Sequence, residues 1–432
     1  MSAQHPWRAV ALAAALFAAC AATADEPAVT AMDDIGESYV KLVLATGLHD
    51  SGYVDAYYGP QAWRDEAEAE APALSAIRGR ATTLLDELDR TPVPASETEA
   101  LRRRYLATQL GSLVARIDLL NGKRLTFDQE SLALYGAVAP QHDDAYFQEI
   151  LDELEPLLPG NGPLSDRYGE FLTHFVIPPE RLDTVFRAAI EACRARTAAH
   201  LNLPTDESFV LEYVRDKPWG AYNWYQGGYR SLIQVNTDLP IYIDRAIDLA
   251  CHEGYPGHHV YNLSLERALV RERGWPEFQV YALFSPQSLI AEGTANYGIE
   301  VAFPGESRSQ YEREVLFPLA GLDPSSADTY HAVQELVEKL GYAGNEAARR
   351  YVDGKIDADA AAEWLMRYAM MTPDRARQRM RFIDQYGAYV INYNLGQDLV
   401  RAYVERRSGG DPDRTWDEFA TLLASPRLPP DL

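Results

Sequence analysis

The sequence has few cysteines. Its 432 residues include only three, Cys20, Cys193 and Cys251, and no two of them form a Cys-x-x-Cys pair. This scarcity excludes a disulfide framework and a zinc site built from cysteines. In an oxidising compartment Cys193 and Cys251 could form a disulfide bond, and two unpaired buried thiols are the alternative. Both states stay open here, because spacing along a chain does not show whether two residues lie close together.

Basic side chains and long apolar runs are also scarce. The chain has 40 Lys and Arg against 64 Asp and Glu, which gives a formal charge of -24. Such an acidic protein is a poor partner for nucleic acid and for anionic membrane surfaces. Beyond the N-terminal segment, no uninterrupted apolar run approaches the roughly 20 residues that a membrane-spanning helix needs. We therefore expect no nucleic-acid partner and no transmembrane segment.

Residues 1–24 have the pattern of an export signal. Arg8 precedes the short apolar run AVALAAALFAACAA, and Ala22-Thr23-Ala24 has the small-x-small form of a cleavage site. This pattern predicts a signal peptide over residues 1–24 and a periplasmic location for the mature protein. Cys20 follows the letters LFAA, which resemble a lipoprotein box. A lipid anchor at Cys20 is therefore the alternative.

Most of the remaining chain has helical periodicity. Apolar residues recur at spacings of three and four, which predicts helices over residues 32–48, 96–122, 178–201 and 285–303. Residues 207–214 and 229–236 are short and rich in β-branched and aromatic residues, which predicts two strands connected by residues 217–228. The expected fold class is mainly α, with a small antiparallel β-element. We expect residues 25–432 to form one large helical domain, with lobes 25–205 and 206–432 as a possible division.

Three of the nine histidines cluster with a glutamate in the stretch HEGYPGHH. These residues are His252, Glu253, His258 and His259, and the helix that carries the first of them is expected to begin near Pro240. Two histidines bind one zinc ion when their side chains converge, as they do at positions i and i+4 of a helix. The cluster therefore predicts a metal site, and a purely structural histidine cluster is the alternative.

The spacing of the histidines does not suit a regular helix. At about 100° and about 1.5 Å per residue, His258 would lie roughly 120° around the helix from His252, and His259 about 10 Å further along the axis. Pro256 lacks an N–H group and its ring clashes with the preceding turn, while Gly257 permits a widened turn. We expect a bulge at this pair that brings His258 to the position of the second ligand. His259 is the alternative ligand, and whichever histidine does not bind metal is expected to contact substrate.

The other components of a metal site can also be assigned. A glutamate next to a ligand histidine takes the proton of the water that the metal activates, which predicts Glu253 as the general base. A third ligand is needed, and a carboxylate on a following helix is a common solution. Glu292 stands inside the apolar run of the predicted helix 285–303 and is the best candidate. Asn296, one turn further on, could hold the ring N–H of a histidine ligand.

Two motifs resemble a known bacterial family. HEGYPGHH followed by EGTANYGIE is similar to the motif pair of domain-of-unknown-function family 885, exported proteins with a helical fold like that of zinc peptidases. Residues 381–400 resemble the C-terminal region of that family through Arg381, Tyr393 and Gly396. Two positions depart from the family pattern, Thr294 in place of its usual tryptophan and Tyr261 in place of a common glutamine.

The resemblance implies further roles. The wider likeness is to zincins with a glutamate as third ligand, and a related group that widens its histidine motif around a glycine supports His258 as the ligand. The strand at 229–236, with Asn236, would hold substrate backbone. Tyr393 would stabilise the oxyanion, and Arg381 would bind a substrate carboxylate.

The expected activity is hydrolysis by a zinc metallopeptidase that acts on short peptides. Zn²⁺ is the expected cofactor, and Glu253 the base that activates water. Two alternatives belong to other classes. One is a different zinc amidohydrolase that cuts cell-wall peptides or acyl amides. The other is a non-catalytic binding protein that contains a metal.

Overall fold

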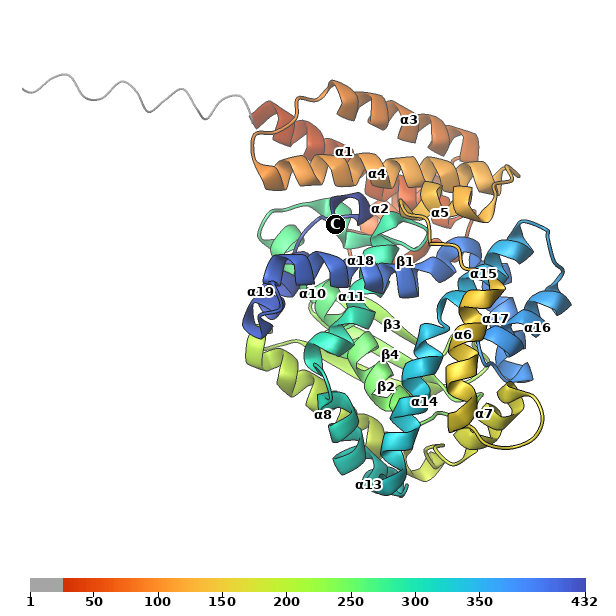
Figure 1. Ribbon diagram of the computed structural model, residues 1–432. Coiled ribbons are helices and arrows are strands. Elements are labelled where there is room, and N and C mark those ends of the chain that lie inside the picture. Colours follow the sequence, from red (N-terminus) through yellow and green to blue (C-terminus); the bar gives the residue numbers. More distant parts are fainter. Residues whose placement is uncertain (1–25) are drawn as a thin grey trace, which may run out of the picture.

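The computed structural model describes residues 26–432, so the predicted signal peptide and Cys20 lie outside the described residues. The expected mainly helical fold is confirmed (Figure 1). The four predicted helices are present as α1 (Glu26–Gly47), α4 (Glu97–Leu120), α8 (Leu182–His200) and α11 (Pro286–Ala302). Within residues 26–432, none of the helices combines the length and the apolar composition that crossing a membrane requires.

The longer helices gather in three groups (Figure 1). The group at the top of the picture consists of α1 and α4 with α2 (Gln61–Glu70), α3 (Leu74–Arg90) and α5 (Phe127–Tyr135). The group at the right consists of α6 (Asp144–Leu154), α7 (Leu164–Thr173), α14 (Ala327–Lys339), α15 (Tyr342–Val352), α16 (Ala358–Tyr368) and α17 (Pro373–Tyr386). The central group consists of α8 and α11 with α10 (His258–Leu265), α18 (Ile391–Ser408) and α19 (Pro412–Leu423). Three short helices, α9 (Asp244–Leu249), α12 (Ser307–Tyr311) and α13 (Phe317–Ala320), lie between longer elements.

The β-structure comprises two small sheets. The two predicted strands are β2 (Ser208–Val214) and β4 (Arg230–Asn236), but the connection between them contains a further strand, β3 (Ala221–Gly227). The strand order is β2-β4-β3, with β2 parallel and β3 antiparallel to the central β4. The prediction that residues 217–228 only connect two strands was therefore wrong. The second sheet pairs β1 (Val54–Tyr57) with β5 (Val280–Ala282) in antiparallel fashion.

The helix before the histidine cluster begins later than predicted. It starts at Asp244 instead of near Pro240. Upstream of it, the backbone pairs with another segment, because Ile177 N–H donates to Ile241 C=O at 2.9 Å and Ile243 N–H donates to Phe175 C=O at 3.0 Å. Long-range backbone hydrogen bonds therefore replace the helical turn that Pro240 suggested.

Helices α11 and α18 cross at unusually short range. A Cβ atom on Gly293 would lie 2.4 Å from the carbonyl oxygen of Gly396, and one on Gly396 would lie 2.7 Å from the carbonyl oxygen of Leu289. Only glycine fits at such a crossing. Gly396 therefore allows the backbone of α18 to lie directly against α11. It brings the start of α18 next to Glu292 on α11.

The two cysteines of the described chain form a disulfide bond between Cys193 and Cys251, with their Cα atoms 5.6 Å apart. Cys193 lies on α8, and Cys251 lies in the π-helix η3 (Ala250–Gly254) directly before His252. The question that the sequence left open is thus answered by proximity. The bond ties the histidine-bearing turn to α8, one of the longest helices of the central group.

We expect the Cys193→Ala/Cys251→Ala variant to unfold more easily than the native protein. The cysteines are separated by 58 residues, and closing a loop of that length is worth about 3–4 kcal/mol of unfolding free energy. Guanidinium unfolding of the metal-free proteins measures the difference. An unchanged free energy of unfolding under oxidising conditions would show that the two cysteines are not bonded.

Candidate metal centre

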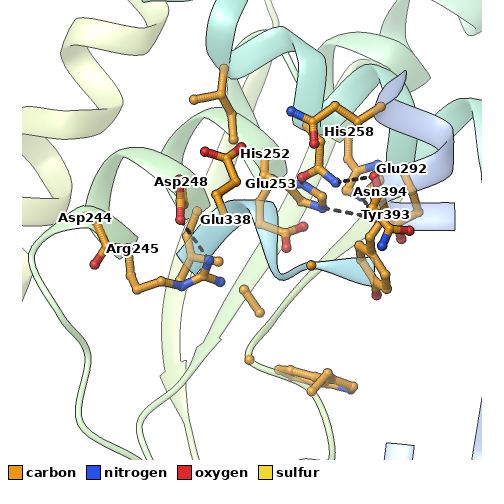
Figure 2. A pocket seen from close by; sticks show the side chains of 18 of the residues that line it. Asp244, Arg245, Asp248, His252, Glu253, His258, Glu292, Glu338, Tyr393 and Asn394 are labelled. Atoms are coloured by element: carbon orange, nitrogen blue, oxygen red, sulfur yellow. Dashed lines mark hydrogen bonds and ion pairs between the residues drawn. The ribbon is translucent and has the colours of Figure 1, made fainter. Parts of the chain in front are cut away.

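His252, His258 and Glu292 converge on one point in the structure. The Nε2 atoms of His252 and His258 lie 3.2 and 3.7 Å from Glu292 Oε2. One ligand atom from each of the three residues falls within 4.8 Å of the others, so the group could hold a metal ion. Figure 2 shows the three side chains turned toward one another, with Glu253 beside them in the cavity. The set of two imidazoles and one carboxylate is the ligand chemistry that zinc takes in catalytic sites.

The backbone around Pro256 and Gly257 brings the two histidines together. The helix widens into the π-turn η3 over Ala250–Gly254 and then ends, and α10 starts at His258. Gly257 N–H reaches back to the carbonyl of Cys251 at 2.9 Å. A Cβ atom on Gly257 would lie only 1.9 Å from the carbonyl oxygen of His252. The widened turn that the sequence predicted is present, followed by a full interruption of the helix.

Asn296 fixes the orientation of His252. The side-chain amide of Asn296 donates to the backbone carbonyl of Tyr393 at 3.0 Å, which directs its carbonyl oxygen toward His252 Nδ1, 2.8 Å away. His252 Nδ1 must then carry a hydrogen, since the amide oxygen can only accept. Its Nε2 atom is left facing Glu292, as a metal ligand requires.

Glu292 has one oxygen that the chain itself does not satisfy. Its Oε1 accepts a hydrogen bond of 2.7 Å from the hydroxyl of Tyr389, whereas its buried Oε2 has no hydrogen-bond partner in the described chain. Burial raises the pKa of Glu292, but His252 and His258 outweigh it and bring this pKa well below its usual range. A buried anionic oxygen aimed between two imidazole nitrogens fits a cation, so these three side chains suit a bound metal ion.

His252 and Glu292 shift each other's pKa. Burial lowers the pKa of His252, but the neighbouring carboxylates of Glu292, 3.2 Å away, and of Glu253 raise it to about 9. In the metal-free protein His252 therefore carries a proton in the position where a metal ion would bind.

Glu253 is buried, and its side chain lines the same cavity as the two histidines. Its backbone carbonyl accepts a hydrogen bond of 2.6 Å from Asn223 on β3, which anchors the turn that carries it. Burial raises the pKa of the Glu253 carboxyl, while the neighbouring His252 and His258 lower it. A carboxylate with a raised pKa beside a metal-ligand group has the properties of a general base.

His259 does not face the candidate metal centre. Its side chain is fully buried, with Nδ1 2.9 Å from Ser231 Oγ and Nε2 3.0 Å from Glu207 Oε2. Both ring nitrogens are thus occupied within the protein. Tyr255 donates to the same Glu207 carboxylate at 2.5 Å. The expectation that His259 binds metal or contacts substrate is corrected, because this residue joins α10 to the neighbouring sheet.

Asn236 also has a position different from the one expected. Its side-chain amide donates to the carbonyls of Lys217 and Trp219 at 3.0 and 2.9 Å, and its side-chain oxygen accepts from Asp238 N–H at 3.0 Å. These bonds hold the loop before β3. Within this sheet, the strand that lines the cavity is the edge strand β3, while β4 lies in the centre. We therefore correct the assignment of β4 and Asn236 to substrate binding.

The arginine of the C-terminal region that faces the cavity is Arg379. Arg381 is exposed and lies outside the set of described residues that line the cavity, whereas Arg379 belongs to that set. Residues two apart point to nearly opposite sides of a helix such as α17, which explains the difference. We correct the assignment of Arg381 accordingly. Tyr393, in contrast, lines the cavity as expected, with its pKa raised by burial and by the charge of Glu292.

The cavity has a volume of about 1190 Å³ and is lined by segments from distant parts of the chain. Its walls come from η3 and α10, which carry the histidines, and from β1, β3, β5, α9, α11, α12, α14, α17 and α18. Figure 2 shows Asp244, Arg245 and Asp248 of α9 on the side away from Glu292, and Glu338 of α14 between them and the histidines. A space of this size exceeds what a drug-sized ligand occupies and accommodates a short peptide.

Two further cavity residues were not predicted from the sequence. Tyr389 supports Glu292, and Asp55 on β1 accepts a hydrogen bond from Tyr222. Burial raises the pKa of Asp55 to about 8, and the charges of Glu292 and Glu253 add to the effect. Tyr389 precedes Tyr393 by one helical turn, and that spacing is a signal that could have identified it. Asp55 lies far upstream on a short strand, where no local pattern marks it.

The buried pair of Glu312 and Arg308 predicts a dependence of stability on pH. Glu312 is fully buried beside Arg308, at 2.8 Å, and burial raises its pKa from 4.5 to about 7 although Arg308 lowers it. The folded protein keeps this proton at pH values where the unfolded chain has lost it. The contribution of Glu312 to stability is therefore fully present below about pH 4.5 and is lost as the pH rises through 7.

We expect Glu312→Gln to gain about 1–3 kcal/mol of stability relative to the native protein between pH 5 and pH 8. Glutamine cannot ionise, so the variant escapes this loss. Chemical unfolding of both metal-free proteins at the two pH values measures the change, with the exposed Glu335→Gln as control. A difference between native and variant that is the same at both pH values would contradict the assignment.

Comparison with known proteins shows a likeness in fold. No protein-family model matches the chain, and no curated protein matches it. The crystal structure of a lipoprotein candidate from Colwellia psychrerythraea is similar, with a TM-score of 0.51 and 15% identity over 83% of this chain and 68% of that one. A protein called BsuCP has a TM-score of 0.46 and 14% identity, over 93% of this chain and 88% of that one. A lipoprotein candidate of unknown function from Shewanella oneidensis has a TM-score of 0.43 and 11% identity, over 83% and 75%. At these identities the likeness concerns the fold alone.

Proposed function

We propose that the protein is a zinc-dependent hydrolase, and specifically a metallopeptidase that cleaves short peptides. The observation that carries this proposal is the convergence of His252, His258 and Glu292 beside the buried carboxylate of Glu253 in one large cavity. A site that only bound metal for structural reasons would have no use for an uncoordinated carboxylate or for a cavity of about 1190 Å³. His258 is the second ligand in this assignment, since the ring nitrogens of His259 are occupied elsewhere.

Each residue of the site has a defined task. A zinc ion bound by the three ligands would polarise the scissile carbonyl and make a water molecule more acidic. Glu253 takes a proton from the attacking water and delivers it to the leaving amine, so that its carboxylate is restored at the end. Asn296 keeps the Nε2 atom of His252 directed at the metal position. Tyr393 is the candidate donor to the developing oxyanion. Its side chain lines the cavity and lies one helical turn after Tyr389, which binds Glu292.

The shape of the cavity favours peptide substrates. β3 is an edge strand of its sheet, and Ala221, Tyr222 and Asn223 of this strand line the cavity. An extended peptide can add to such an edge through backbone hydrogen bonds. The turn with Glu253 is bound to the same strand through Asn223. A peptide bound along β3 would thus run past the general base.

We also propose that the chain is a member of family 885 and that it is exported. The two motifs by which it resembles that family supply His252, His258 and Glu292, which lie together in space. The continuous hydrophobic core from Met32 to Leu428 supports a single domain over residues 25–432. Mass spectrometry of the protein from its native host tests export. A mature chain that begins at Asp25 indicates cleavage of a signal peptide, a lipidated Cys20 indicates an anchor, and an intact N-terminus would contradict both.

Metal-dependent peptide hydrolysis tests the proposed activity. We expect protein loaded with one equivalent of zinc to cleave members of a library of unmodified peptides of three to eight residues (on the order of what the cavity can hold). Chelation should abolish the activity and added zinc should restore it. Zinc-loaded protein that leaves all of these peptides intact but cleaves muropeptides or acyl amides would assign it to another class of amidohydrolase. A lack of activity on every amide tested would favour a binding protein.

A further inference from the structure

Arg379 is a cation without a counter-charge in the wall of the cavity. Its Nε atom is buried and has no hydrogen-bond partner, and no ion pair joins the guanidinium to a carboxylate within residues 26–432. The guanidinium carbon lies 5.0 Å from the ring centre of Phe382 and 5.9 Å from that of Tyr393. A Cβ atom on Gly344 would lie 3.7 Å from one of its terminal nitrogens, so that the adjacent helix α15 presents no side chain there.

The other arginines of the cavity wall are all bonded within the protein. Each has a partner at 2.8–3.1 Å: Arg245 and Arg308 bind Asp248, Arg401 binds Glu300, and Arg375 donates to the carbonyl of Pro240. Arg379 is the exception, in a protein with 64 acidic residues. Burial lowers the pKa of Arg379, and the residue that opposes this effect is Tyr393 and not a carboxylate. Leaving a buried guanidinium nitrogen without an acceptor is costly, which indicates that a ligand in the cavity supplies the anion.

Arg379 is close to the reaction site. Tyr389 donates to Glu292 at 2.7 Å, the rings of Tyr389 and Tyr393 are 5.9 Å apart, and Arg379 lies over the ring of Tyr393. Two aromatic side chains, Tyr393 and Tyr389, thus connect the arginine to Glu292 at the candidate metal centre. This arrangement would place an anion bound to Arg379 on the side of the cavity where Tyr393 and Glu292 lie.

We infer that Arg379 binds the C-terminal carboxylate of the substrate, so that the protein removes residues from the carboxyl ends of peptides. This inference rests on the proposed peptidase function and adds that the protein cleaves at the C-terminal end of the peptide. A guanidinium pairs with a carboxylate through two parallel hydrogen bonds, which fixes both distance and angle. Every unmodified peptide carries such a carboxylate at a constant distance from its last amide bond. An Asp or Glu side chain offers the same chemistry, and the experiment separates the two sources.

The test uses zinc-loaded native protein and three versions of a cleavable peptide. The first peptide has a free C-terminus and the second a C-terminal amide, and in both a glutamine stands next to the C-terminal group. The third has a C-terminal amide as well, but a glutamate replaces this glutamine. We expect kcat/KM for the free acid to exceed that of either amide by about 100-fold, mainly through KM. Equal rates on the first two peptides would overturn the inference. Recovery of the rate by the glutamate alone would assign Arg379 to a side-chain carboxylate, and would also overturn it.

The variant Arg379→Gln completes the test. We expect it to lose about 100-fold in kcat/KM on the free acid while its rate on the amide stays within about twofold, and we expect Arg379→Lys to recover part of the loss. Zinc content and melting temperature of the variants verify that they fold. If Arg379→Gln lost the same factor in kcat/KM on the free acid and on the amide, Arg379 would support the structure of the cavity and would not bind the carboxylate.

A binding measurement keeps this inference separate from the proposed activity. If zinc-loaded native protein cleaved no peptide, the proposed function would fail. Calorimetry with zinc-loaded Glu253→Gln protein would still compare the affinities of the free acid and the amide. Tighter binding of the acid, lost in the double variant with Arg379→Gln, would support the carboxylate site, and equal binding of the two peptides would refute it.

Discussion

Glu253→Gln should retain its zinc and lose turnover by at least about 10³-fold, because proton transfer by a positioned base and the activation of water both depend on this carboxylate. Glutamine has nearly the same shape but cannot accept the proton. The side chain lies outside the ligand group His252–His258–Glu292, so the metal should remain bound. Steady-state kinetics on a cleaved peptide, together with elemental analysis of the same sample, measures both quantities.

Glu338→Gln is the matched control. Glu338 lines the same cavity, but its side chain is exposed, lies on α14 and is not part of the ligand group. The control variant should keep its turnover within about threefold of the native value, as is usual for an exposed side chain outside the chemistry. If Glu253→Gln were as active as Glu338→Gln, the assignment of Glu253 as general base would be wrong.

Gly257→Ala should lower zinc affinity by more than about 100-fold, since ligand geometry tolerates deviations of only a few tenths of an ångström. A Cβ atom at this position would lie 1.9 Å from the carbonyl oxygen of His252 and 2.5 Å from that of Cys251. Both are backbone atoms, so the turn that carries the first ligand must move. The substitution should also lower the melting temperature, because Gly257 is tightly packed against this backbone.

Gly111→Ala controls for the change of residue type. Gly111 lies within α4 and a Cβ atom there would meet nothing within 4 Å. Alanine at an open helical position stabilises by about 1 kcal/mol relative to glycine and should leave zinc binding unchanged. Zinc titration with a competing chelator, and thermal unfolding of the metal-free proteins, compare the two variants. If Gly257→Ala bound zinc as tightly as the native protein, the turn would not have the role that we assign to it.

The parts of the fold that could be predicted depend on local pattern. Helical periodicity identified α4, α8 and α11 to within four residues at each end, whereas α1 begins six residues before the predicted start at residue 32. The convergence of His252 and His258 followed from the properties of a Pro-Gly pair, which are local as well. Glu292 could be selected because a charged residue inside an apolar helix has few explanations other than a partner in the core.

The parts that could not be predicted depend on contacts between distant segments. Helix α9 begins at Asp244 because residues 241–243 bond to residues 175–177. Pro218, Gly220 and Gly227 lie at the ends of β3 and are residue types typical of loops. The segment is therefore recognised as a strand only through its pairing with β4. The pairing of Cys193 with Cys251 likewise depends on the packing of α8 against η3.

The choice between neighbouring side chains also required the structure. Family resemblance pointed to Arg381, while the orientation of α17 places Arg379 in the cavity wall. His258 and His259 are adjacent in the chain, and their roles separate only because Glu207 and Ser231 occupy the ring of the second. Residues one or two positions apart on a helix face different sides. After an irregular turn, the sequence alone does not show which of them faces the cavity.

The central claim is that His252, His258 and Glu292 together bind a zinc ion, and anomalous diffraction tests it most directly. Crystals of protein purified without chelator and supplied with one equivalent of zinc would be measured on both sides of the zinc absorption edge. We predict one strong anomalous peak per chain, about 2.0–2.2 Å from Nε2 of both histidines and from a carboxylate oxygen of Glu292. A map with no peak among these three side chains, or with its peak at His259, would contradict the claim.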